Sequence, residues 1–155
     1  MKRFISLLIL FQVGSSLYTQ TSIDWQKSFG GTQDDYPDYV ANEIVTSDGS
    51  YFLAGTSNSN DGNVSGSHGN EDFWVFKLNA SGVLQWQKSY GGSQDEYASA
   101  FIQTSDNGFI IVGTTYSNDG NVTGNLGDYD IWVLKISSTG SIQWTKCFGG
   151  SDADY

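Results

Sequence analysis

Two copies of one loop carry acidic and amide side chains that could bind a metal ion. The loop 59–66 reads Ser-Asn-Asp-Gly-Asn-Val-Ser-Gly, and it recurs at 117–124 with Thr in the seventh position. Carboxylate and amide oxygens are the ligands that calcium prefers. The calcium candidates are therefore Asp61, Asn63, Asp119 and Asn121.

The spacing within this loop does not match an EF-hand. The bidentate Glu of that motif would fall at His68 in one copy and at Leu126 in the other. The alternative to a metal site is an Asp-Gly turn whose Asn side chains bond the local backbone. We favour the turn, and we expect no cofactor other than this candidate calcium.

A second acidic set follows each Gly-Gly pair and could supply the carboxyl pair of a glycosidase. The set comprises Asp34, Asp35, Asp95, Glu96, Asp152 and Asp154. Glycoside hydrolysis needs two carboxyl groups about 5 Å or about 6.5–9.5 Å apart across a sugar. An active site is normally unique, whereas this set recurs in every copy. We therefore expect turns and lysine pairing here, and we assign no catalytic residue.

Five lysines also keep fixed positions relative to a tryptophan: Lys27, Lys77, Lys88, Lys135 and Lys146. We expect each stem to cover an aromatic ring, with the ammonium reaching solvent or an Asp of the Gly-Gly loop. A catalytic lysine is the alternative. His68 is the single histidine and has no counterpart in the next copy, so a His-centred triad or zinc site has no support. Cys147 stands where the other copies have Ser, which indicates a strand residue rather than a reactive thiol.

These residues belong to a tandem repeat that is marked by a Trp-x-Lys segment. Ile23–Gly31, Leu84–Gly92 and Ile142–Gly150 share the pattern Trp-x-Lys-x-Phe/Tyr-Gly-Gly. When Gly55–Gly92 is laid over Gly113–Gly150, 20 of 38 positions are identical. The repeat region 23–155 therefore holds units 25–85 and 86–143 and a partial unit 144–155.

Each whole unit predicts four β-strands and no helix. The apolar runs are 39–46, 51–56, 72–78 and 84–90 in the first unit, and 97–104, 109–114, 130–136 and 142–148 in the second. The second and third runs are apolar at successive positions, which predicts burial on both faces. The first unit has three extra residues at 34–38, where Pro37 favours a loop.

Stacked four-stranded antiparallel sheets in tandem predict an all-β fold made of β-propeller blades. A β-sandwich is the alternative, but it does not predict near-identical units. A closed propeller needs at least four blades. We therefore expect an incomplete propeller and a chain that is truncated at its C-terminus, in which 23–29 could complete the last blade.

Composition and charge exclude several classes of function. Aromatic residues make up 15% of the chain, which is ample for a packed core and excludes a disordered protein. The net charge is −10, and no basic patch occurs, so we expect no nucleic-acid partner.

The first residues predict export. Residues 1–19 resemble a secretory signal peptide: Lys2 and Arg3 precede the apolar run 4–13, and small residues follow it. The run is too short to span a bilayer as a helix, so we expect no membrane span once the signal is removed. The expected location is secreted or cell-surface.

The Trp-x-Lys-x-Phe/Tyr-Gly-Gly-x-x-x-Asp segment, the Thr-Ser-Asp-Gly turn, the Ser-Asn-Asp-Gly-Asn-Val-x-Gly loop and the Asp-x-Trp-Val-x-Lys strand resemble the β-propeller repeats of secreted Bacteroidetes-type proteins. The resemblance covers 23–155. It implies a blade fold, and a sorting domain of the type IX secretion system often follows such repeats. Some members are labelled endoglucanase-like, although no catalytic motif here supports that label.

These observations predict a non-catalytic scaffold for binding or surface display, with an extracellular glycan or protein as ligand. The alternative is part of a secreted polysaccharide-active enzyme whose catalytic residues lie outside this chain.

Overall fold

The computed structural model describes residues 23–37 and 43–155, in which every regular element is a β-strand. The expected signal segment and residues 38–42 lie outside the described residues. Within the described ranges no helix could cross a membrane. The strands are β1 (Asp35–Tyr36), β2 (Ile44–Val45), β3 (Tyr51–Ser57), β4 (Asp72–Leu78), β5 (Leu84–Tyr90), β6 (Glu96–Gln103), β7 (Phe109–Thr115), β8 (Asp130–Ile136) and β9 (Ile142–Phe148).

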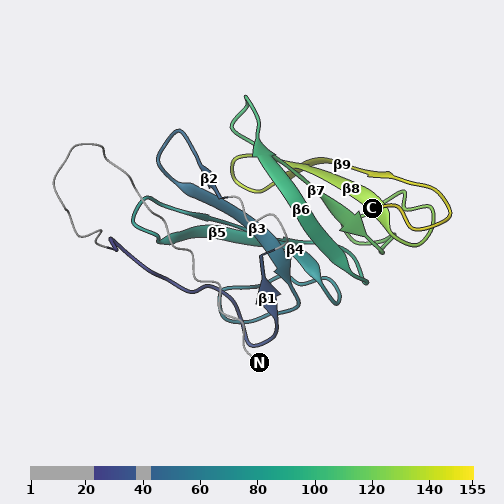
Figure 1. Ribbon diagram of the computed structural model, residues 1–155, viewed down its shortest axis with the longest axis horizontal. Helices are drawn as coiled ribbons and strands as arrows, with labels where there is room; N and C mark the ends of the chain where they lie inside the picture. The colour runs from purple at the N-terminus through teal and green to yellow at the C-terminus, as the bar shows by residue number, and fades with distance from the viewer. Residues whose placement is uncertain (1–22, 38–42) are drawn as a thin grey trace, which may run out of the picture.

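The strands form two antiparallel sheets that follow one another along the chain (Figure 1). The first sheet has the order β3-β4-β5, and both β1 and β2 pair with the free side of β3. The second sheet has the order β6-β7-β8-β9. The all-β prediction is confirmed. The last strand of each sheet, β5 or β9, spans a predicted boundary between repeat units, at 85/86 and at 143/144.

The two sheets have the same register. Gly55 pairs with Trp74 in the first sheet, and Gly113 pairs with Trp132 in the second. In both sheets the pairing register also shifts just before the last residue of the third strand. The shift follows Lys77 of β4 in the first sheet and Lys135 of β8 in the second. Near-identical sequences thus give the same local geometry twice.

The edge strand is where the sheets differ. In the second sheet β6 pairs with β7 along its length, with a bulge between Ala98 and Ala100. In the first sheet the same edge is split into β1 and β2, two residues each. The predicted strand 39–46 is therefore only partly seen, as β2. The predicted loop 34–38 was wrong at Asp35 and Tyr36, which pair with Ser57 and Thr56.

One turn shows why the repeat tolerates a substitution. The turn between the edge strand and the next strand needs one residue with positive φ, a conformation that favours Gly and Asn. Gly49 takes it in the first sheet with φ 75°, and Asn107 takes it in the second with φ 62°. The two turns keep the same backbone bonds, from Gly49 N–H to the Thr46 carbonyl and from Asn107 N–H to the Thr104 carbonyl.

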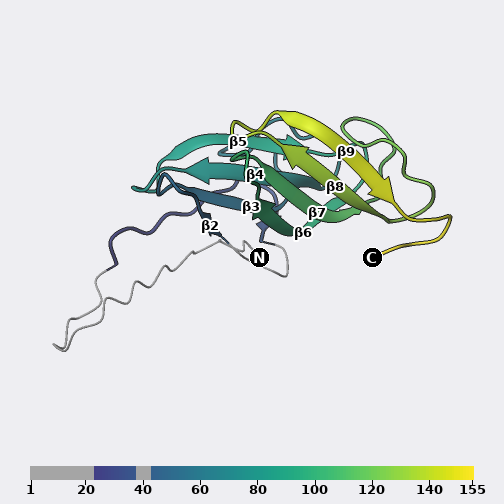
Figure 2. The ribbon, with the colours of Figure 1, turned by 90° about the horizontal axis from the view of Figure 1, so that it is seen from above.

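The main core lies between the sheets, along a contact that we call the seam (Figure 2). Phe52 of β3 stacks on Phe109 of β7, with ring centroids 3.6 Å apart and an angle of 6° between the ring planes. The first sheet also contributes Phe73, Val75 and Tyr90, and the second contributes Ala98, Ile111, Val122, Trp132, Leu134 and Ile136. The prediction that the aromatic residues are mostly core is confirmed for Trp74 and Trp132, which are both buried.

The other face of the first sheet is covered by the segment 23–29. Trp25 meets Tyr51 edge-on with centroids 5.6 Å apart, and Phe29 lies 5.5 Å from Phe76. The segment forms no strand, and none of the described strands pairs with it. That 23–29 completes the last blade of a full ring stays a prediction.

Candidate functional site

The Gly-Gly turn between the sheets is held by side chains of the second sheet. We call 91–96 the second connector. Four successive backbone N–H groups of this connector, from residues 91 to 94, each donate to a side-chain oxygen. The acceptors are Asn121 Oδ1 at 3.3 Å, Glu96 Oε2 at 2.8 Å, Asp119 Oδ1 at 2.7 Å and Ser117 Oγ at 2.9 Å. Each such bond contributes about 0.5–3 kcal/mol, the larger values applying to charged acceptors.

The same four bonds recur one repeat earlier. We call 30–35 the first connector. Its amides 30–33 donate to Asn63 Oδ1 at 3.3 Å, Asp35 Oδ2 at 2.7 Å, Asp61 Oδ1 at 2.7 Å and Ser59 Oγ at 3.1 Å. We call the acceptor segments, 59–63 and 117–121, the clamp loops. Each clamp loop also donates from its last residue back to the carbonyl of the first glycine.

In the third copy, 149–154, only one of the four bonds is made among the described residues. Gly150 N–H donates to Asp154 Oδ2 at 2.7 Å, as in the other two connectors. The amides of Gly149, Ser151 and Asp152 have no acceptor among the described residues, and these residues are exposed. The carboxylate that closes the turn is thus intrinsic to each connector, whereas the other three bonds need a neighbouring sheet.

The four calcium candidates all belong to the clamp loops. The oxygens that the sequence offered to calcium accept backbone N–H groups from a connector 26–33 residues away. An N–H donor and a cation compete for the same lone pairs, so this arrangement does not fit a metal that uses these oxygens. No group of three or more His, Cys, Asp or Glu that could hold a metal occurs in the described part of the chain. The favoured turn is the closer description, but its bonds are long-range rather than local.

Two buried carboxylates meet at the second connector. Glu96 and Asp72 are both fully buried. Glu96 also accepts from Thr115 Oγ1 at 2.6 Å, and Asp72 Oδ2 accepts from the His68 backbone N–H at 2.6 Å. Among the described residues, Asp72 Oδ1 has no hydrogen-bond partner. The free oxygen and Glu96 Oε2 both lie against the α-carbon of Gly91, where a Cβ would overlap them.

Burial sets the protonation of this pair. It raises the pKa of Asp72, and it raises the pKa of Glu96, with the charge of Asp72 adding to the effect on Glu96. Sequence analysis missed Asp72 as a site residue. The sequence does carry a signal for it: in both units an Asp, at 72 and at 130, begins a strand that is apolar on both faces.

The second glycine of each connector allows the clamp loop to approach. A Cβ at Gly92 would lie 2.5 Å from Ser117 Cβ and 2.7 Å from the Asp119 carbonyl oxygen. A Cβ at Gly31 would meet Ser59 Cβ at 2.6 Å. A Cβ at Gly150 would meet only Asp154 Oδ2, at 3.8 Å. Glycine is therefore required where a clamp loop is present.

Two of the five lysines, Lys77 and Lys135, pair with an acid outside the Gly-Gly loop, whereas Lys27, Lys88 and Lys146 are exposed to solvent, as the prediction allowed. Lys77 Nζ lies 3.0 Å from Asp48 Oδ2, and Lys135 Nζ lies 3.0 Å from Asp106 Oδ2. Both partners belong to the edge turn, not to the Gly-Gly loop, because the third strand runs alongside β3 or β7 and delivers its lysine to that end of the sheet. These two ion pairs join the third strand of each sheet to its edge turn.

The other chemical candidates are His68, Cys147 and the acids of the connectors. The imidazole Nδ1 of His68 is 3.5 Å from Asp72 Oδ2. Cys147 is half-buried on β9, and burial raises its pKa to about 11, so its thiol stays protonated at neutral pH. Asp34 and Asp152 are exposed, whereas Asp35 is buried and bonded to its own connector.

Two shallow grooves open along the seam. One is lined by residues that include Ser65 of the loop before β4, Gln87 of β5 and Asn121 of the second clamp loop. The other lies at the opposite end of the strands, where Gln85 and Trp86 of β5 face Gln103 and Asn107 of the second sheet. The second groove combines an indole with three amide side chains, a lining that suits a sugar ring.

The comparisons add no family to this description. Neither a scan against models of protein families nor a search of curated proteins found a match.

Proposed function

We propose that this chain is an exported, non-catalytic scaffold of propeller-type blades that presents its grooves and loops for binding or surface display. The observation that carries the proposal is the clamping of both connectors. In each, acids and amides that resembled chemical sites hold the Gly-Gly turn against the sheet that follows it.

The buried acids support a structural role over a catalytic one. Glu96 and Asp35 accept hydrogen bonds from the connector and from hydroxyls of the same sheet. A glycosidase acid must reach a bound sugar, and these carboxylates are covered by protein. The rival remains a polysaccharide-active enzyme with catalytic residues elsewhere.

The second groove is the proposed binding surface. Trp86 is half-buried there and offers part of its ring, while Gln85 is exposed beside it. An extracellular glycan, or a loop of another protein, would use the ring for stacking and the amides for hydrogen bonds.

Binding and hydrolysis can be measured on the same preparation. We expect saturable retention on a polysaccharide or protein ligand from an immobilised panel, at least 10-fold weaker in Gln85→Ala/Gln103→Ala. Ser138→Ala, at the rim of the same groove, is the matched control and should bind within twofold of the parent. We expect no release of reducing ends. Steady release that scales with protein concentration would sink the non-catalytic proposal.

Export has its own test. When the chain is made in a Gram-negative host, we expect the mature N-terminus, read by mass spectrometry of the extracytoplasmic fraction, near residues 17–20. A chain that is found only in the cytosol and still begins at Met1 would contradict this part of the proposal.

A further inference from the structure

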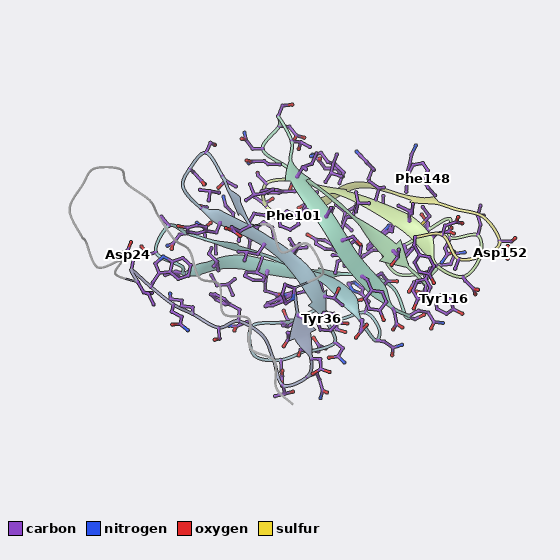
Figure 3. The ribbon with its side chains drawn as sticks, in the orientation of Figure 1. Asp24, Tyr36, Phe101, Tyr116, Phe148 and Asp152 are labelled. Atoms are coloured by element: carbon purple, nitrogen blue, oxygen red, sulfur yellow. The ribbon has the colours of Figure 1, made fainter. Side chains whose placement is uncertain are left out.

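One face of the second sheet carries exposed apolar side chains where the first sheet is buried. Ile102 is 59% exposed, Trp144 44% and Phe148 53%. Their counterparts in the first sheet are Ile44, Trp86 and Tyr90, which all belong to the core along the seam. Figure 3 shows Phe148 at the outer side of the second sheet, whereas Phe101 lies where the two sheets meet.

The third connector adds unused hydrogen-bond donors at the edge of that face. Its amides at Gly149, Ser151 and Asp152 correspond to the three that a clamp loop binds in the other two connectors. Gly150 leaves open the space that Ser117 and Asp119 fill around Gly92. The apolar side chains and N–H donors of this face therefore have the same arrangement as those that the first sheet and the second connector bring to the seam.

We propose that a second copy of this chain docks on this face, through its first sheet and its clamp loop 59–63. That sheet presents the complementary surface. Its face away from the seam carries Tyr51, Val64, Trp74, Phe76 and Leu78, which stand at the positions of Phe109, Val122, Trp132, Leu134 and Ile136. The latter set is the one that already packs on Trp86 and Tyr90.

Docking requires an exchange. The acceptor face of the second copy is covered by its own segment 23–29, through Trp25 and Phe29. Strand β9 is a copy of that segment, so Trp144 and Phe148 would take the places of the two aromatics. Segment 23–29 pairs with none of the described strands, whereas β9 is part of a whole sheet. The bonds to the clamp loop are re-formed one for one, and the buried apolar area increases.

Two copies are enough to use both faces. Each chain offers one donor face and one acceptor face, and two chains supply four stacked sheets, the smallest number that closes a propeller. A charge of −10 on each chain opposes the contact. Salt screens that repulsion, so association should strengthen with salt.

Sedimentation velocity at about 1–100 μM, with a reductant that excludes disulfides through Cys147, tests the proposal. We expect a species of twice the mass of the mature monomer, more populated at 0.5 M than at 0.05 M NaCl. A monomer at all concentrations would overturn the proposal, and so would an open series of larger species.

Gly150→Ala separates docking from folding. Within one chain a Cβ there meets nothing closer than 3.8 Å, so the circular dichroism and unfolding midpoint of the monomer should not change. In the pair it would collide with the incoming clamp loop, and the dissociation constant should rise at least 10-fold. Gln94→Ala is the control, because the Gln94 side chain is exposed in the second connector, between the two sheets of one chain and away from this face. Undiminished association of Gly150→Ala, or equal loss in Gln94→Ala, would refute the exchange.

Discussion

The second and third connectors are copies of one segment that have different surroundings. Both begin with Gly-Gly after an aromatic residue, and both close on a carboxylate five residues after the first glycine, Glu96 or Asp154. Gly91 and Gly92 are buried, whereas Gly149 and Gly150 are exposed. The turn therefore forms from its own sequence, while its burial and three of its four hydrogen bonds come from the next sheet.

The two connectors should differ most in how much a glycine-to-alanine substitution lowers the free energy of unfolding. Gly92→Ala should destabilise the fold by about 3 kcal/mol, because the Cβ would press on Ser117 and on the backbone of Asp119. Gly150→Ala should change the free energy of unfolding by less than about 0.5 kcal/mol. Urea denaturation at low micromolar concentration gives both values. Equal costs would mean that the clamp loop does not approach the second connector as described.

Removal of the repeat tryptophan should give a smaller difference. Trp86 packs along the seam but keeps part of its surface exposed, so Trp86→Ala should cost about 2 kcal/mol, below the range for a fully buried tryptophan. Trp144→Ala should cost under about 1 kcal/mol, because the ring of Trp144 is 44% exposed. The same denaturation series measures both variants. A larger loss at Trp144 would show that β9 is covered within a single chain.

The smallest effect is the pH dependence that the buried acids give to the second connector. The pKa values of Asp72 and Glu96 are raised, so the folded chain holds protons that the unfolded chain releases above its ordinary values of 3.8 and 4.5. The stabilisation that these two carboxyl groups contribute therefore falls as pH rises from their ordinary pKa values towards the raised values in the folded chain. We expect the unfolding midpoint to be higher at pH 5 than at pH 8, and the difference to shrink in Asp72→Asn.

The exposed Asp34→Asn serves as the control for this pH test, because it removes one charge from the surface and leaves the buried pair intact. It should keep the parent pH dependence. The edge turns act in a lower window: Thr104 and then Lys135 lower the pKa of Asp106 to about 2, so that stabilisation is lost only as pH falls from about 4 towards 2. If Asp72→Asn and Asp34→Asn have the same pH profile, general charge repulsion would explain the slope.

Much of the architecture could be predicted from the sequence. The apolar runs that became β3, β4, β7 and β8 are long and end at turn residues, and their burial follows from their composition. The strands with the Trp-x-Lys pattern, β5 and β9, were also predicted at the right residues. The edge of the first sheet was not, because Pro37 and the insertion break the pattern there.

The candidate site was predicted only in part. The residues of the clamp loops stood out as a repeated polar motif, but their partners are backbone amides 26–33 residues away. A backbone amide has no sequence signature, so the motif resembled a cation site. The lysine partner was wrong for a similar reason, since strand pairing rather than spacing brings Lys77 to Asp48.

Hydrogen exchange at the connectors tests the central claim most directly. At a concentration where the chain is monomeric, the amides of Gly91, Ser93 and Gln94 should show protection factors at least 10-fold above those of Gly149, Ser151 and Asp152. The amides of Gly92 and Gly150 should differ less, because each keeps its bond to the carboxylate of its own turn. Equal protection across the two connectors would contradict the account in which the second sheet clamps the turn that leads into it.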